Sequence, residues 1–387
     1  MDIKGYTKYR SASAIAGQVL QNVISVAVPG MSVAAICSYS DSLIDAHCKS
    51  VHRKEEGIER GVAFPTTVSV NKVIQNFSPN ASEDYILREG DVAKIEVGVH
   101  IDGYMASVAH TTVATNSPGV TVTDRRADAI SAAYYASEVA TRMIRPGQTP
   151  RNLIKAIGLV ASGFNCTVAE ETFTCQIDRF VISGKNTFAN RFNPDVVVPE
   201  TPFETGEIYT VDCSISTGDG QARASDYSAT IFQRDVNQQY SLKLRTSRML
   251  FSEISNRFSV FPFLMRDAVG DNHALKAGIN ECVRSRLLVP FAVTTEKKNG
   301  NQYVAQFKIT VICHYTGPVR LTQPLPMPNV QSATAIPPES EIGQILALGF
   351  EQAPAPELPR LKNTVPAPVL TLAESSAAQA ASSMDLS

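Results

Sequence analysis

The chain has 387 residues and a mass of 41.8 kDa, with 44% hydrophobic and 19% charged residues. This composition is typical of a folded globular protein and excludes a wholly disordered chain. The 35 Lys and Arg residues nearly balance the 37 Asp and Glu residues, so the net charge gives no long-range attraction for nucleic acid or an anionic membrane, and such a partner would need a local basic patch.

The sequence contains no signal for membrane insertion or secretion. No apolar run approaches the roughly 20 residues that span a bilayer, and the first ten residues, MDIKGYTKYR, lack the apolar core of a secretion signal. The seven cysteines are scattered and form no Cys-x-x-Cys pair, so neither a disulfide framework nor a structural zinc site is predicted. We expect an intracellular protein with buried thiols and no membrane partner.

The first elements in the chain are two predicted helices joined by a Pro-Gly break. Apolar residues at helical spacing lead to Pro29-Gly30, and Ser32 stands where it can cap a second helix over residues 33–44. The same order recurs about 115 residues later. There Pro146-Gly147 ends a helix, and Thr149 can cap the next one over residues 153–160.

A strand follows each helix pair at the same offset. An Arg-Glu-Gly-Asp turn precedes a predicted strand over residues 92–99, and a Glu-Thr-Gly-Glu turn precedes another over residues 208–215. Two independent features at one offset indicate two copies of a helix–helix–strand unit. The sequence therefore predicts an α/β domain, residues 1–345, built from two pseudo-symmetric halves.

Two segments depart from this repeat. Residues 239–300 are more helical and more charged, and they interrupt the sheet before a predicted strand over residues 302–313, so they are predicted to be a helical insertion. Residues 346–387 are rich in Pro, Ala and Ser and poor in large apolar side chains. Such a segment cannot offset its ordering entropy, and we expect a flexible tail.

The repeat places two carboxylates at equivalent positions. Period-two alternation puts Glu96 and Asp212 on the polar faces of their strands, and a pseudo-twofold relation would turn both toward one central cleft. A dinuclear metal hydrolase needs such carboxylates, because hard cations require anionic oxygens that also lower the pKa of a bridging water. Two carboxylates alone are too few for that purpose.

Longer sequence motifs are more specific than these two carboxylates. They are Phe64-Pro65-Thr66-Thr67-Val68-Ser69-Val70-Asn71, Tyr85-Ile86-Leu87-Arg88-Glu89-Gly90-Asp91, Gly98-Val99-His100-Ile101-Asp102-Gly103-Tyr104, Val108-Ala109-His110-Thr111, residues 242–248 and Val304-Ala305-Gln306-Phe307-Lys308. The chain resembles the proliferation-associated, ErbB-binding protein family, also known as curved-DNA-binding proteins, over residues 5–322. These proteins are non-peptidase relatives of type II methionine aminopeptidase. The resemblance implies the pita-bread fold, a curved antiparallel sheet with helices and internal pseudo-twofold symmetry.

The resemblance also implies a degenerate metal site. The active peptidases hold two metals with two aspartates, one histidine and two glutamates. In that order these positions are here Glu96, Ser107, Cys175, Asp212 and Lys308, and the position of the substrate histidine is Asn76. Two of the five ligand positions keep a carboxylate. A seryl oxygen is a poor ligand, and a lysine ammonium repels a divalent ion in a low-dielectric cleft. We therefore expect no enzyme activity, no metal and no cofactor.

The sequence allows two interpretations of Lys308. Alternation along residues 304–310 puts it on the polar face of its strand, where its ammonium would replace the metal and pair with Glu96 and Asp212. The alternative is a lysine that points to solvent. Cys175 with Asp212 is too small a set for a soft metal, and His100 and His110 are expected to be hydrogen-bonded structural histidines.

The resemblance implies that the chain binds partners. The family associates with the large ribosomal subunit around the exit tunnel, with ribosomal RNA, and with structured or curved DNA, in the control of ribosome biogenesis, translation and growth. Lys243, Arg245 and Arg248 are the predicted phosphate-binding residues, with an ordinary solvated helix start as the alternative. A second basic cluster over residues 49–54 is diluted by Glu55 and Glu56, and we expect ordinary surface there.

These considerations leave three functions open. The first is a monomeric ribosome- or RNA-associated regulator, cytoplasmic with a nuclear or nucleolar pool. The second is a protein-binding adaptor, or a transcriptional co-regulator that binds DNA. The third is an active methionine aminopeptidase, against which Ser107, Lys308 and Asn76 argue.

Overall fold

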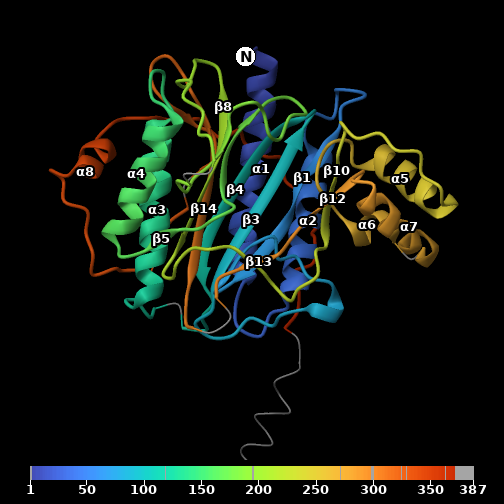
Figure 1. Ribbon diagram of the computed structural model, residues 1–387, viewed down its shortest axis with the longest axis horizontal. Coiled ribbons are helices and arrows are strands. Elements are labelled where there is room, and N and C mark those ends of the chain that lie inside the picture. Colours follow the sequence, from blue (N-terminus) through green and yellow to red (C-terminus); the bar gives the residue numbers. More distant parts are fainter. Residues whose placement is uncertain are drawn as a thin grey trace, which may run out of the picture.

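The structure is a computed structural model that describes residues 2–117, 119–193, 196–270, 272–297, 300–323, 325–327, 329–361 and 363–370 (Figure 1). Within them, the main sheet has ten strands, and its central path runs in the order β1-β3-β4-β14-β8-β6-β7. These strands are β1 (Arg60–Val70), β3 (Val92–Ile101), β4 (Tyr104–Val113), β14 (Val304–Ile312), β8 (Ile208–Ser216), β6 (Phe173–Ile177) and β7 (Thr187–Ala189). Each pairs antiparallel with its neighbours. Three short strands join this path: β5 (Thr167–Val168), β15 (Val319–Arg320) and β16 (Glu351–Gln352).

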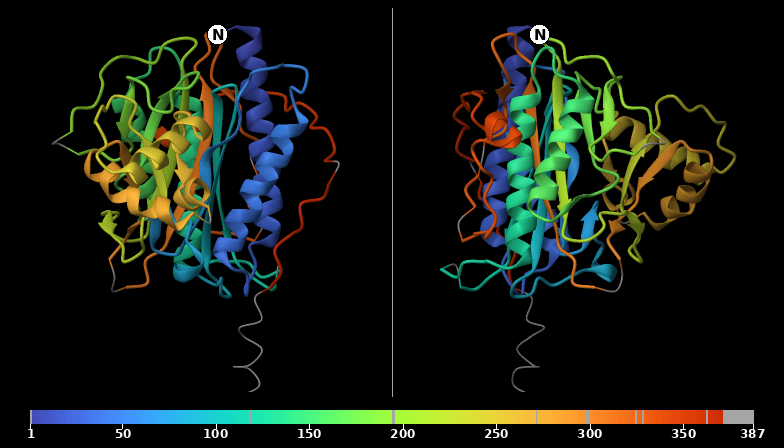
Figure 2. Two further views of the ribbon diagram at one scale, coloured as in Figure 1. Left: turned by 90° about the vertical axis from the view of Figure 1, so that its right-hand side faces the viewer. Right: turned by 60° about the vertical axis from the view of Figure 1, so that its left-hand side comes forward.

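Four long helices pack against the sheet in two pairs. They are α1 (Ile3–Val26), α2 (Val33–Ser50), α3 (Arg125–Met143) and α4 (Pro150–Gly163). Helix α1 contacts β3 and β4, α2 contacts β1, and α3 contacts β14 and β8. Figure 2 shows α1 and α2 along one face of the sheet. Each pair buries its own hydrophobic core against its half of the sheet, so burial of apolar surface holds the two layers together.

The predicted repeat is present in the chain order. The first half runs α1-α2-β1-β3-β4 and the second runs α3-α4-β6-β8-β14, and the two halves meet where β4 pairs with β14. Both turns between the helices use a glycine in the left-handed region, Gly30 with φ +85° and Gly147 with φ +86°. Both predicted caps form: Ser32 Oγ accepts from Ala35 N–H and Thr149 Oγ1 accepts from Asn152 N–H.

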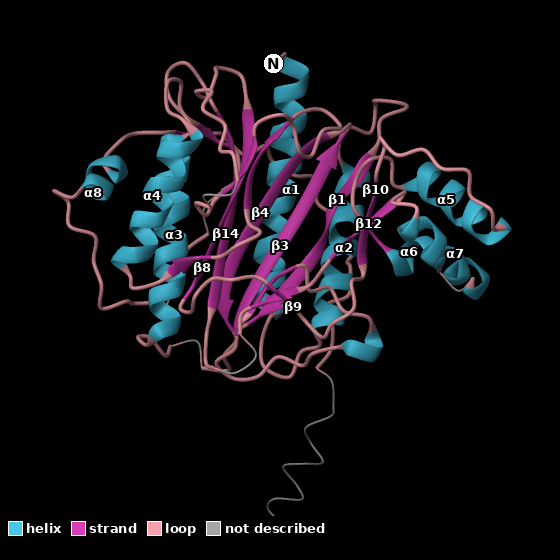
Figure 3. Ribbon diagram, in the orientation of Figure 1, coloured by secondary structure: helices cyan, strands magenta, loops and turns pink. Residues whose placement is uncertain are grey.

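The segment predicted to be an insertion contains α5 (Arg245–Arg257), α6 (Met265–Val269) and α7 (His273–Arg284). A three-stranded sheet of β10 (Ile231–Arg234), β11 (Phe263–Leu264) and β12 (Leu288–Phe291) joins these helices to the edge of the molecule (Figure 3). The unit has its own hydrophobic core. A further small sheet of β2 (Val73–Gln75), β13 (Thr294–Thr295) and β9 (Arg223–Ala224) lies outside the repeat, as does a 3₁₀ turn over Ala81–Glu83.

The C-terminal segment follows the body of the protein as far as residue 370. After α8 (Glu341–Leu346), strand β16 pairs with β15, and Leu358, Leu361 and Val365 pack against the core of the first half. The predicted flexible tail over residues 346–387 stays a prediction, and its part over 371–387 lies outside the described residues. None of the described helices combines the length and the apolar character that crossing a bilayer requires.

Candidate functional site

The register of the main sheet places four residues in one row across four strands. Glu96 of β3 lies opposite Ala109 of β4, Ala109 lies opposite Lys308 of β14, and Lys308 lies opposite Asp212 of β8. Directly opposed residues project from the same face of an antiparallel sheet. Because Ala109 has a short side chain, Lys308 reaches across β4, and its Nζ lies 2.6 Å from Glu96 Oε1 and 3.6 Å from Asp212 Oδ2.

These three charges are largely removed from water. The side chain of Lys308 is 19% exposed, and those of Glu96 and Asp212 are 5% and 6% exposed. Burial by itself lowers the pKa of the Lys308 ammonium, but the adjacent carboxylates of Glu96 and Asp212 outweigh it and raise that pKa above its ordinary value. Lys308 is therefore a fixed cation at neutral pH.

Neutral side chains complete the network. Gln306 Nε2 donates to Glu96 Oε2 at 3.1 Å and to Asp212 Oδ2 at 2.7 Å, and Ser214 Oγ donates to Asp212 Oδ1 at 2.7 Å. Each of the four carboxylate oxygens consequently has a donor. A buried charge is tolerated when it is paired and its remaining acceptors are bonded, which is the condition met here.

The other predicted positions flank this network. Ser107 of β4 lies opposite Gly98, and its backbone N–H and C=O both bond the hydroxyl of Thr310. Cys175 of β6 is half-buried opposite Thr210, and burial raises the pKa of its thiol although Lys308 acts in the other direction. Neither the Ser107 hydroxyl nor the Cys175 thiol supplies an anionic oxygen for a hard cation.

The side-chain amide of Asn76 makes a structural hydrogen bond. It follows β2 in the left-handed region, with φ +66°, and its amide donates to the backbone C=O of Ala292 at 2.9 Å. The backbone conformation suits asparagine better than most residues. The amide is thereby committed to holding the loop after β12.

This donor set does not fit the two metal ions of the active relatives. Among the described residues, no group of three or more His, Cys, Asp or Glu side chains is arranged to hold a metal ion. The two carboxylates present are both bonded by Lys308 and Gln306. A divalent ion would have to displace a cation that already pairs with both of them, so no reaction step through a metal follows from these residues.

The predicted phosphate-binding residues lie in the insertion, away from the central row. Lys243 and Arg245 are exposed at the start of α5, while Arg248 donates to the carbonyls of Leu242 and Lys243, both at 2.8 Å. The carboxylate of Glu281, from α7, accepts the backbone N–H groups of Lys243 and Leu244. All three residues are exposed, and Arg248 is also bonded to the backbone before α5.

Sequence reasoning missed two contributors and misjudged one histidine. Gln306 lies two residues before Lys308 and Ser214 two residues after Asp212. Period-two alternation puts each on the same strand face as its neighbour, and that pattern could have indicated their contacts. The prediction of a hydrogen-bonded His100 is wrong at its Nδ1 atom, which is buried without a partner. The ring instead stacks on Phe261, with centroids 4.1 Å apart, because the insertion packs over this end of β3.

Comparisons with protein families, sequences and solved structures agree on what this chain is similar to. A model of metallopeptidase family M24 matches residues 7–168. The chain is 39% identical to ErbB-3 binding protein 1 of Solanum tuberosum over 344 residues, which cover 88% of this chain and 87% of that protein.

Two solved structures share the fold. One, titled as the structure of a thermophilic Arx1, superposes with a TM-score of 0.82 at 29% identity, over 91% of this chain and 100% of that one. The other is methionine aminopeptidase from Thermotoga maritima, with a TM-score of 0.57 at 14% identity, over 84% of this chain and 98% of that one. The predicted pita-bread fold with its internal repeat is thereby confirmed.

Proposed function

The chain belongs to the M24 metallopeptidase family, in the group of the ErbB-3-binding proteins, and from this premise we propose that it acts by binding partners and does not hydrolyse peptides. The observation that carries the proposal is the bond between Lys308 and Glu96, with Asp212 beside it. This ammonium stands at a position where the family resemblance implies a metal-ligating carboxylate.

The free-energy cost of removing the Lys308 cation supports the proposal that this chain does not hydrolyse peptides. Deprotonating a lysine at neutral pH costs about 5 kcal/mol even at the ordinary lysine pKa of about 10.4, and the pKa of Lys308 lies above its ordinary value. Moving the side chain aside would leave the two buried carboxylates unpaired. Either route works against metal binding and against formation of a bridging hydroxide.

The proposed partner is the large ribosomal subunit and its RNA near the exit tunnel, as the family resemblance leads us to expect. Lys243 and Arg245 support this proposal, because they are exposed on the insertion and can meet phosphate groups. On this proposal the protein is a regulator of ribosome biogenesis, translation and growth. We also propose a cytoplasmic location with a nuclear or nucleolar pool, which imaging of a fluorescent fusion tests.

Gradient sedimentation of cell extract, at low and high salt and with and without ribonuclease, tests the proposed partner. Cosedimentation with large subunits at low salt is expected to weaken as salt rises, because counterions are released from phosphates on binding. Ribonuclease should release the protein. A protein that stays at the top of the gradient under all four conditions would contradict the proposal.

Variants that remove surface charges test which residues contact the ribosomal subunit. Lys243→Gln/Arg245→Gln should weaken binding to purified large subunits and reduce the slope of log K against log salt by up to about 2, since two phosphate contacts are lost. The matched control is Arg53→Gln/Lys54→Gln, which removes two charges from the basic cluster that was predicted to be ordinary surface. Equal losses in the two double variants would argue against a site on α5, and association insensitive to both salt and ribonuclease would favour the adaptor function.

A further inference from the structure

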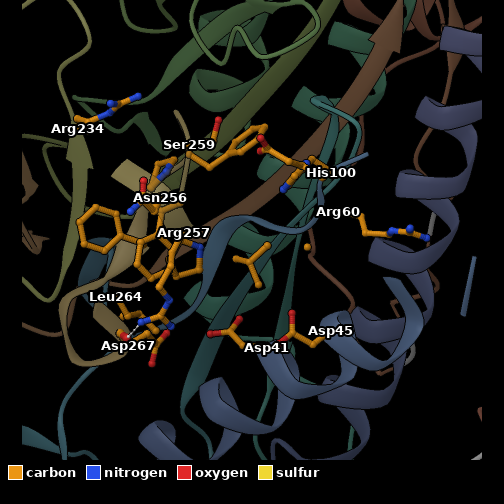
Figure 4. A pocket seen from close by; sticks show the side chains of 18 of the residues that line it. Asp41, Asp45, Arg60, His100, Arg234, Asn256, Arg257, Ser259, Leu264 and Asp267 are labelled. Carbon is orange, nitrogen blue, oxygen red and sulfur yellow. Dashed lines mark hydrogen bonds between the residues drawn. The ribbon is translucent and has the colours of Figure 1, made fainter. Parts of the chain in front are cut away.

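A cavity of about 530 Å³ opens between α2, the first half of β1 and the loop that joins α5 to α6 (Figure 4). It shares no lining residue with the network of Glu96, Asp212, Gln306 and Lys308. Its volume is within the range of roughly 300–1,000 Å³ that is usual for small-ligand sites. Its walls combine carboxylates, from α2 and α6, with aromatic rings from the insertion.

The carboxylates of this pocket are poorly compensated. Asp41 and Asp45 have no ion pair with any described residue, and Asp267 has only Arg266, at 3.9 Å. Burial raises the pKa of Asp41 to about 7, although the Thr66 N–H bonds its Oδ1 at 3.0 Å, and the negative charge of Asp267 adds to the rise. Desolvation likewise raises the pKa of Asp45 and that of Asp267, although both residues keep exposed surface. A cation in the pocket would favour the charged form of these carboxylates.

Three arginines also line the pocket, and the charge of Arg257 partly offsets that of the Asp267 carboxylate. Arg60 donates to the carbonyl of Val51 at 2.6 Å, and Figure 4 shows its head turned away from the cavity. Arg257 donates to Glu253 Oε1 and to the backbone carbonyl of Asp267. Arg234 donates to the hydroxyl of Ser255 at 3.3 Å but leaves its Nε buried and without a partner, which makes it the one lining group suited to an anion.

His100 is an independent sign of a missing ligand. It lines the pocket, is 6% exposed, and leaves its buried Nδ1 without a hydrogen-bond partner. Burial lowers the pKa of this imidazole to about 4 despite the nearby Asp102, so the ring is neutral at pH 7 and one of its nitrogens is an acceptor. Phe258, stacked on Phe263 with ring centroids 4.6 Å apart, is partly exposed and adds aromatic surface that favours cations.

We propose that this pocket binds an organic cation, the ammonium or guanidinium group of a basic side chain on a partner polypeptide. The carboxylates of Asp41, Asp45 and Asp267 would receive its N–H donors. The neutral His100 would accept one more, and the ring of Phe258 would contact its aliphatic stem. A divalent metal ion is a poorer match, because the described residues provide no group of three or more metal-ligating side chains.

Isothermal titration calorimetry of the full chain at pH 7.5 tests the proposal. The probes are Ac-Gly-Lys-Gly-Arg-Gly-amide, the same peptide with glutamate at both charged positions, and free spermidine. The wild-type protein should bind the basic peptide with 1:1 stoichiometry and show no heat with the acidic one. Asp45→Asn/Asp267→Asn should weaken binding by tenfold or more, and the distant control Glu339→Gln/Glu357→Gln should leave the affinity unchanged.

Further arms separate the remaining possibilities. Arg234→Gln should leave binding of the basic peptide unchanged or tighter, whereas an anion site would bind the acidic peptide and lose it in this variant. Spermidine that binds more tightly than the peptide, with the same loss in Asp45→Asn/Asp267→Asn, would overturn the polypeptide source. Equal affinity of wild type and Asp45→Asn/Asp267→Asn for the basic peptide would overturn the pocket. Circular dichroism and thermal melting of each variant establish that it is folded.

Discussion

At the scale of single residues, Lys308 determines what the centre of the sheet can do. Its ammonium is held by Glu96 and Asp212, and Gln306 and Ser214 donate to the other oxygens of the two carboxylates. A set of buried charges of this kind is sensitive to the loss of one member, because the partners are left uncompensated in a low-dielectric setting. The contribution of Lys308 can therefore be measured as a change in the free energy of unfolding.

Lys308→Met should destabilise the protein by about 3–5 kcal/mol, because Glu96 and Asp212 would be buried without their cation. Urea unfolding at pH 7 measures this change. Lys155→Met is the matched control: it breaks the exposed pair between Lys155 and Glu341, and an exposed pair contributes about 0–1 kcal/mol. A cost for Lys308→Met no larger than that of the control would mean that Lys308 does not neutralise the two carboxylates.

Asp41 gives a prediction on pH dependence. Its pKa is raised to about 7, mainly by burial, so the native state keeps the proton above the unfolded pKa of about 3.9. The stability that the protonated carboxyl contributes below about pH 4 is lost as the pH rises through 7. Asp41→Asn does not titrate and should gain stability relative to wild type between pH 4 and pH 8. Urea unfolding across this range checks it, and a flat difference would contradict the raised pKa.

The residues of the central site were partly predictable. Strand alternation places Lys308 and Gln306 on the face that carries Glu96 and Asp212, so their meeting follows from periodicity once the strands are paired. The pocket of Asp41, Asp267 and His100 could not be predicted in this way. Its residues come from three separate segments, α2, α6 and β3, and local patterns do not reveal contacts that depend on how an insertion packs.

At the scale of elements, the two helix pairs show why the repeat was visible in the sequence. A Pro-Gly break, a left-handed glycine and a hydroxyl cap are local signals, and both copies have all three. Strands β9, β11 and β13 have two residues each. A strand of two residues is too short to show a period-two alternation of apolar and polar side chains. Their two small sheets were accordingly absent from the sequence prediction.

The two caps differ in one contact, and this difference yields a prediction. Ser32 Oγ accepts from Ala35 N–H and also donates to Asp84 Oδ2 at 2.5 Å, whereas Thr149 Oγ1 caps α4 through Asn152 N–H. Loss of a cap costs about 0.5–2 kcal/mol, and a bond to a carboxylate adds to this. Ser32→Ala should therefore cost about 2 kcal/mol and Thr149→Ala about 1 kcal/mol in urea unfolding. The reverse order would show that the bond to Asp84 contributes nothing.

At the scale of the whole molecule, the two halves meet along β4 and β14. The active relatives are implied to hold their metals there, and this chain has Lys308 paired with two carboxylates instead. The fold is kept, since the helices and strands that bury the two cores do not depend on the metal ligands. Proposed binding surfaces lie instead on the insertion and beside it, at Lys243 and Arg245 and in the pocket of Asp41 and His100.

Calorimetric titration of the full chain with Mn²⁺ at pH 7.5 tests the central claim most directly. The wild-type protein should show no saturable binding, because the Lys308 ammonium occupies the space between Glu96 and Asp212 and would repel a divalent ion. The control is Ser107→Asp/Cys175→His/Lys308→Glu, which restores the ligand set implied by the family resemblance and should gain metal affinity. Saturable binding of two Mn²⁺ ions by the wild-type protein, abolished in Glu96→Gln/Asp212→Asn, would contradict the account.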